Sequence, residues 1–170
     1  MAFLLILNHF KMETMKRIAL FIFFASGCLF IGCKKDNTPS PTPTPEELLT
    51  KSLWKLNEIR YSQVNTSGGG ATYYYKRGTT GNISNFDTES LLFAANNTGT
   101  FTLGSTTSPI TWQFTDGEKT KIQWVITYSP GNTLTVNWDN VKITSTTVSY
   151  GEYYTTSTGI TSIGVGSHAH

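Results

Sequence analysis

Cysteine is scarce in this chain, and after Cys33 it is missing altogether. The sequence holds two cysteines, Cys28 and Cys33. Beyond Cys33 the chain therefore cannot form an internal disulfide. Any domain there must be stabilised by side-chain packing and hydrogen bonds.

Net charge is equally scarce. The chain has 13 basic and 11 acidic residues, and three of the basic and one of the acidic residues precede Cys33. The part that follows is therefore neutral. A neutral chain has no electrostatic footprint for nucleic acid, so we expect no nucleic-acid partner.

The uncharged run before Cys33, residues 18–32, is too short to cross a membrane, since a spanning helix needs about 20 apolar residues. It fits the apolar part of a secretory signal instead. Lys16 and Arg17 supply the basic start, and Gly32 supplies the small residue before the cleavage point. The sequence therefore predicts a cleaved signal peptide over residues 1–32.

Cys33 follows this run directly, as the modified cysteine does in a bacterial lipoprotein signal. Its thiol would carry a diacylglyceryl group, and two or more acyl chains give stable membrane anchoring. Cys28 is a second candidate, and a plain secretory signal is the alternative. Met15 would serve as an initiator, which would place residues 1–14 upstream of the true start. We predict a lipoprotein of the bacterial cell envelope, anchored to the outer membrane on its periplasmic or its outer face.

A linker separates this anchor from the rest of the chain. Residues 33–45 contain proline at every second position from Pro39 to Pro45, alternating with serine or threonine. Such spacing blocks helix and favours an extended polyproline conformation. The linker is therefore predicted to act as a spacer between the membrane and a domain over residues 46–170.

The remaining residues predict an all-β domain. Apolar and polar side chains alternate with a period of two, which marks strands with one buried face. This alternation is clearest in 110–114, 122–128 and 134–138, and further strands are predicted at 72–76, 141–145, 147–155 and 159–165. The spacing predicts eight to ten short strands in a sandwich or barrel. One short helical turn is predicted over 46–51.

The first strand changes its alternation midway. Trp54 and Leu56 share one parity, while Ile59 and Tyr61 share the other. A β-bulge near Asn57 and Glu58 would reconcile the two halves by shifting the register one residue.

Four short motifs carry a family resemblance. They are Leu53-Trp54-Lys55-Leu56-Asn57-Glu58-Ile59, then Leu92-Phe93 leading through Asn97-Thr98-Gly99-Thr100 into Phe101, then Ile110-Thr111-Trp112-Gln113-Phe114, and Val141-Lys142-Ile143-Thr144. Through them residues 49–155 resemble the lipocalin-like domains of small lipoproteins common in the Bacteroidota. The resemblance implies a single antiparallel barrel. True lipocalins carry glycine where this chain has Ser52, and their conserved arginine has no match here.

Aromatic residues at core positions are the candidates for ligand binding. Trp54 is predicted to plug the closed end of the barrel against the helical turn. An eight-stranded barrel is either filled by side chains or holds one small ligand. The predicted ligand-binding residues, which could equally fill the core, are Trp112, Phe114, Trp124 and Trp138. The ligand would be a small apolar or amphiphilic molecule.

The alternative function is a surface interaction module for a glycan or an envelope protein. Tyr73, Tyr74 and Tyr75 follow one another, so adjacent rings point to opposite faces of a strand. Tyr74 and Tyr75 are the predicted contact residues, and Tyr150, Tyr153 and Tyr154 could extend the surface. Exposed tyrosines can stack on sugars or anchor an interface.

Little in the sequence points to catalysis. His168 and His170 are the only histidines after Cys33, and they are expected to lie on a frayed tail. The carboxylate pairs Asp87 with Glu89 and Asp116 with Glu118 flank turns and are expected to be solvated. We therefore predict no enzyme, no metal site and no cofactor, and a monomer.

Overall fold

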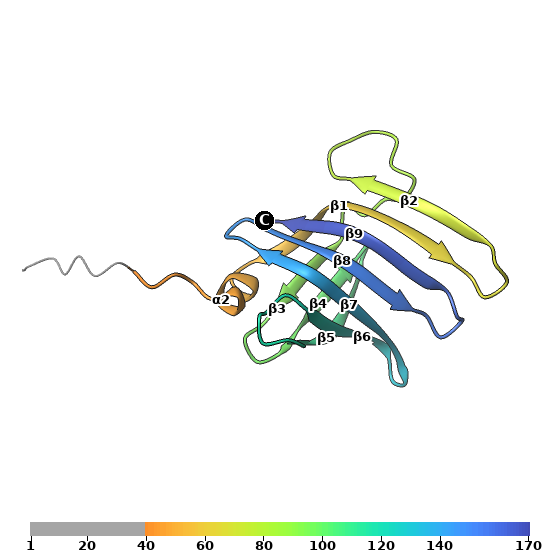
Figure 1. Cartoon of the computed structure of the whole chain (residues 1–170). Helices are drawn as coiled ribbons and strands as arrows, with labels where there is room; N and C mark the ends of the chain where they lie inside the picture. The colour runs from red at the N-terminus through yellow and green to blue at the C-terminus, as the bar shows by residue number, and fades with distance from the viewer. Residues whose placement is uncertain (1–39) are drawn as a thin grey trace, which may run out of the picture. The chain divides into compact units, whose positions relative to one another are not determined.

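Nine β-strands and one short helix make up the part of the chain that the structure describes (Figure 1). This computed structural model describes residues 40–170, of which Thr42–His170 form one unit. The bounds are α2 Pro45–Thr50, β1 Leu53–Val64, β2 Gly70–Lys76, β3 Ser90–Phe93, β4 Thr98–Leu103, β5 Thr106–Phe114, β6 Ile122–Ser129, β7 Asn132–Ile143, β8 Thr147–Thr155 and β9 Thr161–Ala169.

The strands form one antiparallel sheet that closes on itself. Neighbours pair in the order β2, β1, β3, β4, β5, β6, β7, β8, β9, and β1 also pairs with β9. Eight strands therefore make a closed barrel, and β2 is an extra strand along β1. The predicted all-β antiparallel barrel is confirmed.

The predicted signal peptide, residues 1–32, lies outside the described residues, as do Cys33 and most of the 33–45 linker. No helix within residues 40–170 has the length and apolar character needed to span a membrane.

Strand β1 changes its partner along its length. Its first residues pair with β3, and its later residues pair with β2. Along the other edge, its pairing with β9 shifts register between Leu56 and Glu58. The predicted bulge is confirmed. Because of the bulge, Trp54 before it and Ile59 after it are both buried, although they have opposite parity.

Two segments differ from the prediction. Residues 134–138 and 141–145 were expected to form separate strands, but β7 continues through the gap between them, with a register shift between Asp139 and Lys142. Asn140, at φ 48°, bends the strand there without ending it. The tail expected to fray belongs to β9, which pairs with both β1 and β8 as far as Ala169.

Helix α2 covers one end of the barrel. Thr44 and Glu47 form a capping box that fixes where the helix begins. The indole N–H of Trp54 donates to the carbonyl of Leu49 at 2.7 Å and ties β1 to the helix. The ring of His170 packs edge-on against Trp54, with centroids 5.0 Å apart. The predicted role of Trp54 as a plug is confirmed.

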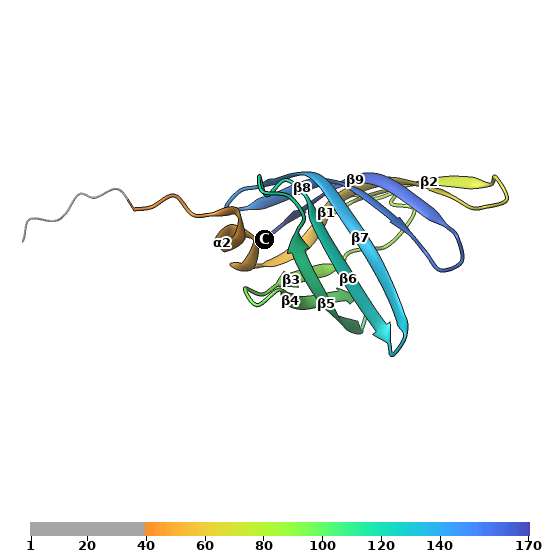
Figure 2. The same cartoon turned by 60° about the horizontal axis from the view of Figure 1, so that its bottom comes forward.

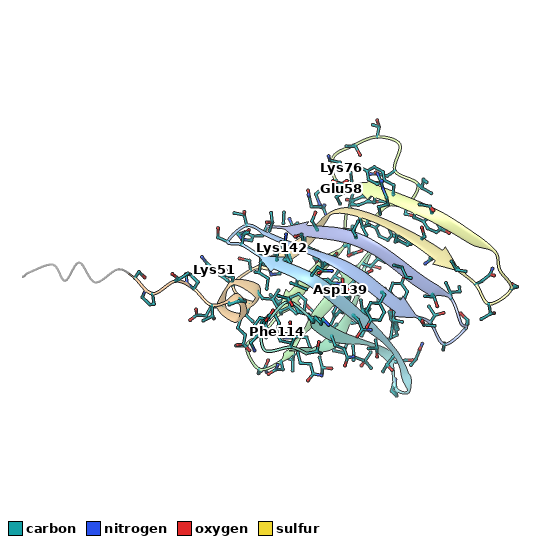
Figure 3. The ribbon with its side chains drawn as sticks, viewed as in Figure 1. Lys51, Glu58, Lys76, Phe114, Asp139 and Lys142 are labelled. Carbon is teal, nitrogen blue, oxygen red and sulfur yellow. The ribbon has the colours of Figure 1, made fainter. Side chains whose placement is uncertain are left out.

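The opposite end of the barrel carries hairpin turns. Figure 2 shows the β6–β7 and β8–β9 turns pointing away from α2. Beyond the barrel, strand β2 is fixed to β1 by ladder pairing and by an ion pair of 3.7 Å between Lys76 and Glu58, both labelled in Figure 3.

Candidate ligand-binding cavity

The barrel interior is filled at one end and hollow at the other. We call the region around Leu49, Trp54, Phe93 and Trp112 the packed end, because these residues are all buried against α2 or one another. The hollow half contains a cavity of about 370 Å³. Residues next to the β4–β5, β6–β7 and β8–β9 turns line it, so it lies toward the end opposite α2.

Most of the cavity wall is apolar and aromatic. Strand alternation places these side chains inside, because every second residue of a strand faces the barrel interior. Phe101 and Trp124 pack together in the wall, with ring centroids 5.9 Å apart. The other apolar side chains of the wall include Ile59, Ile126, Leu134 and Val136.

Glu152 is a carboxylate inside this apolar wall. It lies deep in the protein, yet part of its surface stays accessible through the cavity. The indole N–H of Trp138 on the facing strand donates to it at 2.8 Å. Burial raises the pKa of Glu152 to about 7, although the Trp138 hydrogen bond opposes this rise and the negative charge of Glu89 adds to it.

His168 lines the same cavity as Glu152 and is 1% exposed. Its Nδ1 is 2.9 Å from the hydroxyl of Tyr150. Burial raises the pKa of the Tyr150 hydroxyl well above its usual value, so this group stays protonated. The other ring nitrogen, Nε2, lies 3.4 Å from a carboxylate oxygen of Glu89, within ion-pair distance but without hydrogen-bond geometry. The tautomer that suits both contacts has Tyr150 donating to Nδ1 and the ring proton on Nε2.

Two glycines on β9 lie where a side chain would collide with a neighbour, and Gly166 is the one that makes room for Tyr150. A Cβ on Gly166 would lie 2.8 Å from the hydroxyl of Tyr150, and one on Gly164 would lie 2.5 Å from the carbonyl oxygen of Arg60. The ring of Tyr150 can therefore stack on Trp138, with centroids 3.8 Å apart and planes 7° apart. This stack holds the Trp138 indole that hydrogen-bonds Glu152.

The four predicted ligand-binding aromatics separate into different roles. Trp124 lines the cavity. Trp138 is outside the cavity wall and orients Glu152. Trp112 packs against Phe93 at the packed end, where its indole N–H donates to two backbone carbonyls. Phe114 contacts Trp112 and the ammonium of Lys119, and its position is labelled in Figure 3. Of the four side chains, Trp124 therefore lines the cavity, while Trp112 and Phe114 fill the core, the alternative that the sequence left open. Ligand contact by Trp124 stays a prediction.

The structure corrects the predicted tyrosine surface at Tyr75 and Tyr150, which are buried. Tyr75 is fully buried and donates to Asp87 at 2.7 Å, so it cannot contact a surface partner. The hydroxyl of Tyr74 donates to Glu58, and the guanidinium of Arg60 lies over its ring at 5.4 Å. Tyr150 is buried as well, which leaves Tyr153 as the exposed member of the expected extension.

The polar groups of the cavity were missed by sequence reasoning. Glu89 was expected to be solvated and His168 to fray, yet both line the cavity. Glu152 carried a readable signal, because it shares strand parity with the buried Val148 and Tyr150. A charged residue at a core parity position is a candidate functional residue.

In the second carboxylate pair, Asp116 with Glu118, the aspartate has a structural role. Asp116 accepts hydrogen bonds from the backbone of Thr120 and Lys121 and from the Thr120 hydroxyl. These bonds lower the pKa of Asp116 and fix the β5–β6 turn. Within residues 40–170, no three histidine, aspartate or glutamate side chains are placed to hold a metal ion together.

Comparisons of the chain with protein-family models, curated proteins and solved structures gave no match. Its function must therefore be argued from the cavity itself.

Proposed function

We propose that this protein binds a small amphiphilic molecule inside its barrel while a lipid on Cys33 holds it at the bacterial outer membrane. The observation that carries the binding proposal is the cavity of about 370 Å³ with an apolar wall and a few polar groups. Cavities that bind small molecules have this size, this lining and a small number of orienting polar side chains.

The division of the barrel interior supports binding over plain core filling. A barrel of eight strands is just wide enough for side chains to fill it, and the packed end is filled in that way. The hollow half has comparable strands but leaves space next to Trp124 and Val136. Larger side chains could fill this space, as they do at the packed end. Binding of a ligand would explain why the space is kept.

A neutral fluorescent apolar probe, phenylnaphthylamine, tests the binding proposal with the purified protein. We expect probe fluorescence to rise on binding and the emission of Trp124 to change with it, because Trp124 lines the cavity. Leu134→Trp, which places a larger side chain in the wall, should weaken probe binding at least about tenfold. Leu92→Trp is the matched control, because Leu92 is exposed on β3. Equal binding by both variants would place the probe outside the cavity and refute the proposal.

The membrane anchor has a separate test. Labelled palmitate should mark the wild-type protein in its bacterial host, and Cys33→Ala should abolish the label. Cys28→Ala is the control and should keep it. A protein that remains abundant but carries no label would contradict anchoring through Cys33.

A further inference from the structure

Two carboxylates line the cavity without a cation to balance them. Glu89 and Glu152 both face the cavity. Among residues 40–170, neither forms an ion pair with a lysine or an arginine, and the only ion-pair contact of either is between Glu89 and His168. Carboxylates removed from water normally acquire a paired positive charge.

His168 does not supply that charge to both carboxylates. Its Nδ1 is engaged by Tyr150, and its Nε2 faces Glu89 without forming a hydrogen bond, although the ring is almost fully buried. The cavity region therefore contains a buried ring nitrogen beside Glu89 without a hydrogen bond, and two carboxylates without a lysine or arginine partner. The two carboxylates are hydrogen-bond acceptors, so the group that would balance them is a positively charged hydrogen-bond donor.

We infer that the ligand of this cavity carries a protonated amine on an apolar body, with the ammonium group held by Glu89 and Glu152. An ammonium has three donors and no acceptor, so it suits two carboxylates. The apolar wall around Phe101 and Trp124 would contact the body of the ligand. The inference rests on the proposed function, because it names the ligand class for the same cavity.

Binding of such an amine should depend on pH through Glu152. Burial raises the pKa of this carboxyl to about 7, so a bound ammonium would favour its ionised form and release a proton. An alkylamine stays charged up to about pH 10. Amine affinity should therefore rise between about pH 5.5 and about pH 8. Several other titratable groups share the cavity region with Glu152. They are Tyr150 and Tyr154 on its own strand, His168 on β9, Tyr61 on β1, Tyr128 on β6 and Glu89 before β3.

Three probes with the same alkyl chain test the inference: octylamine, octanol and octanoate, each measured by displacement of phenylnaphthylamine. At about pH 8, octylamine should bind at least about tenfold more tightly than octanol, and octanoate more weakly than both. Glu152→Gln and Glu89→Gln should each remove most of the octylamine preference. Octanol binding is measured on the same variants, and octylamine affinity should fall by a larger factor than octanol affinity. Glutamine at position 152 keeps an acceptor for Trp138.

The outcomes separate this inference from the proposed function. Equal affinity for octylamine and octanol, or tighter binding of octanoate, would overturn the amine inference and leave ligand binding intact. A preference for octylamine that survives both substitutions would also overturn the amine inference, because groups other than Glu89 and Glu152 would then bind the ammonium. Two results together would overturn the proposed function as well. None of the three probes would displace phenylnaphthylamine, and Leu134→Trp would leave phenylnaphthylamine binding unchanged.

Discussion

The packed end and the hollow half of the barrel satisfy their polar atoms in different ways. At the packed end, the indole N–H groups of Trp54 and Trp112 donate to backbone carbonyls. In the hollow half, the indole N–H of Trp124 and Nε2 of His168 are buried without a hydrogen-bond partner. Buried polar atoms without partners lower stability, so proteins retain them mainly where they have another use.

This contrast indicates that the two ends of the barrel have different roles. The packed end joins helix α2 to the strands through Leu49 and Trp54, and Phe93 packs edge-on there against Trp112 and Trp138. The hollow half gives up some of that packing and keeps a carboxylate, Glu152, in an apolar wall. Stability should therefore depend mostly on the packed end, and the ligand binding that we propose should depend mostly on the hollow half.

The largest expected effect is a difference between two truncations. Trp54→Ala should lower the free energy of unfolding by about 4 kcal/mol, because it leaves a void beneath α2 and removes the bond to Leu49. Leu134→Ala should cost only about 1 kcal/mol, because Leu134 is half-buried and already faces empty space. Urea unfolding measures both. Similar losses for the two variants would contradict the contrast between the two ends.

A glycine substitution tests how tightly β9 approaches β1. Gly164→Ala should cost about 1–3 kcal/mol, because its new Cβ would lie 2.5 Å from the backbone oxygen of Arg60 and must displace a strand. Gly117→Ala is the control, because a Cβ there meets no atom within 4 Å, and its cost should stay within about 0.5 kcal/mol. An unchanged urea unfolding midpoint for Gly164→Ala would contradict the tight contact, because β9 and β1 could then move apart at little cost.

Stability should depend on pH through Glu152. Its folded-state pKa of about 7 lies above the ordinary value of 4.5, so the native protein binds more protons than the unfolded chain between these values. Its contribution to stability therefore falls as pH rises through this window and is constant above it. Because the cavity leaves the carboxylate partly solvated, we expect a loss on the order of 2 kcal/mol. Urea unfolding at about pH 4.5 and about pH 7.5 should show this loss in the wild type and a smaller one in Glu152→Gln. Parallel pH profiles would contradict it.

The smallest expected effect compares two tryptophans that face each other across β5 and β6. Trp112→Phe removes a donor from the carbonyls of Ala94 and Thr98 and should cost about 1–2 kcal/mol more than Trp124→Phe, whose indole N–H has no partner. Thermal unfolding of both variants measures the difference. Trp124→Phe should in turn lose the fluorescence response to a bound probe that Trp112→Phe retains. The reverse order of stabilities would mean that the Trp124 indole has a partner after all.

The strands of this fold could be predicted from the sequence because they depend on local alternation. Ile122, Trp124 and Ile126 repeat every second residue and are all buried in β6. The bulge in β1 could also be predicted, because a change of parity needs a register shift. Both features are decided within a few residues of the chain.

The position of the cavity could not be predicted in that way. Trp112 and Trp124 are direct partners across β5 and β6, yet one packs against Phe93 and the other against Phe101 in the cavity wall. The position of the cavity depends on how far side chains extend into the barrel from strands that are far apart in the sequence. His168 shows the same limit, because its burial depends on β9 pairing with β1 and β8.

The pairing of the first strand with the last one also decides when this barrel can be completed. Asn57 and Ser167 meet across β1 and β9 although 110 positions separate them. Until the final strand has been synthesised, β1 has no partner on that edge, and the interior remains open to water. Contacts that close such long loops form late and slowly. A newly made chain should therefore keep its barrel open until β9 pairs with β1 and β8.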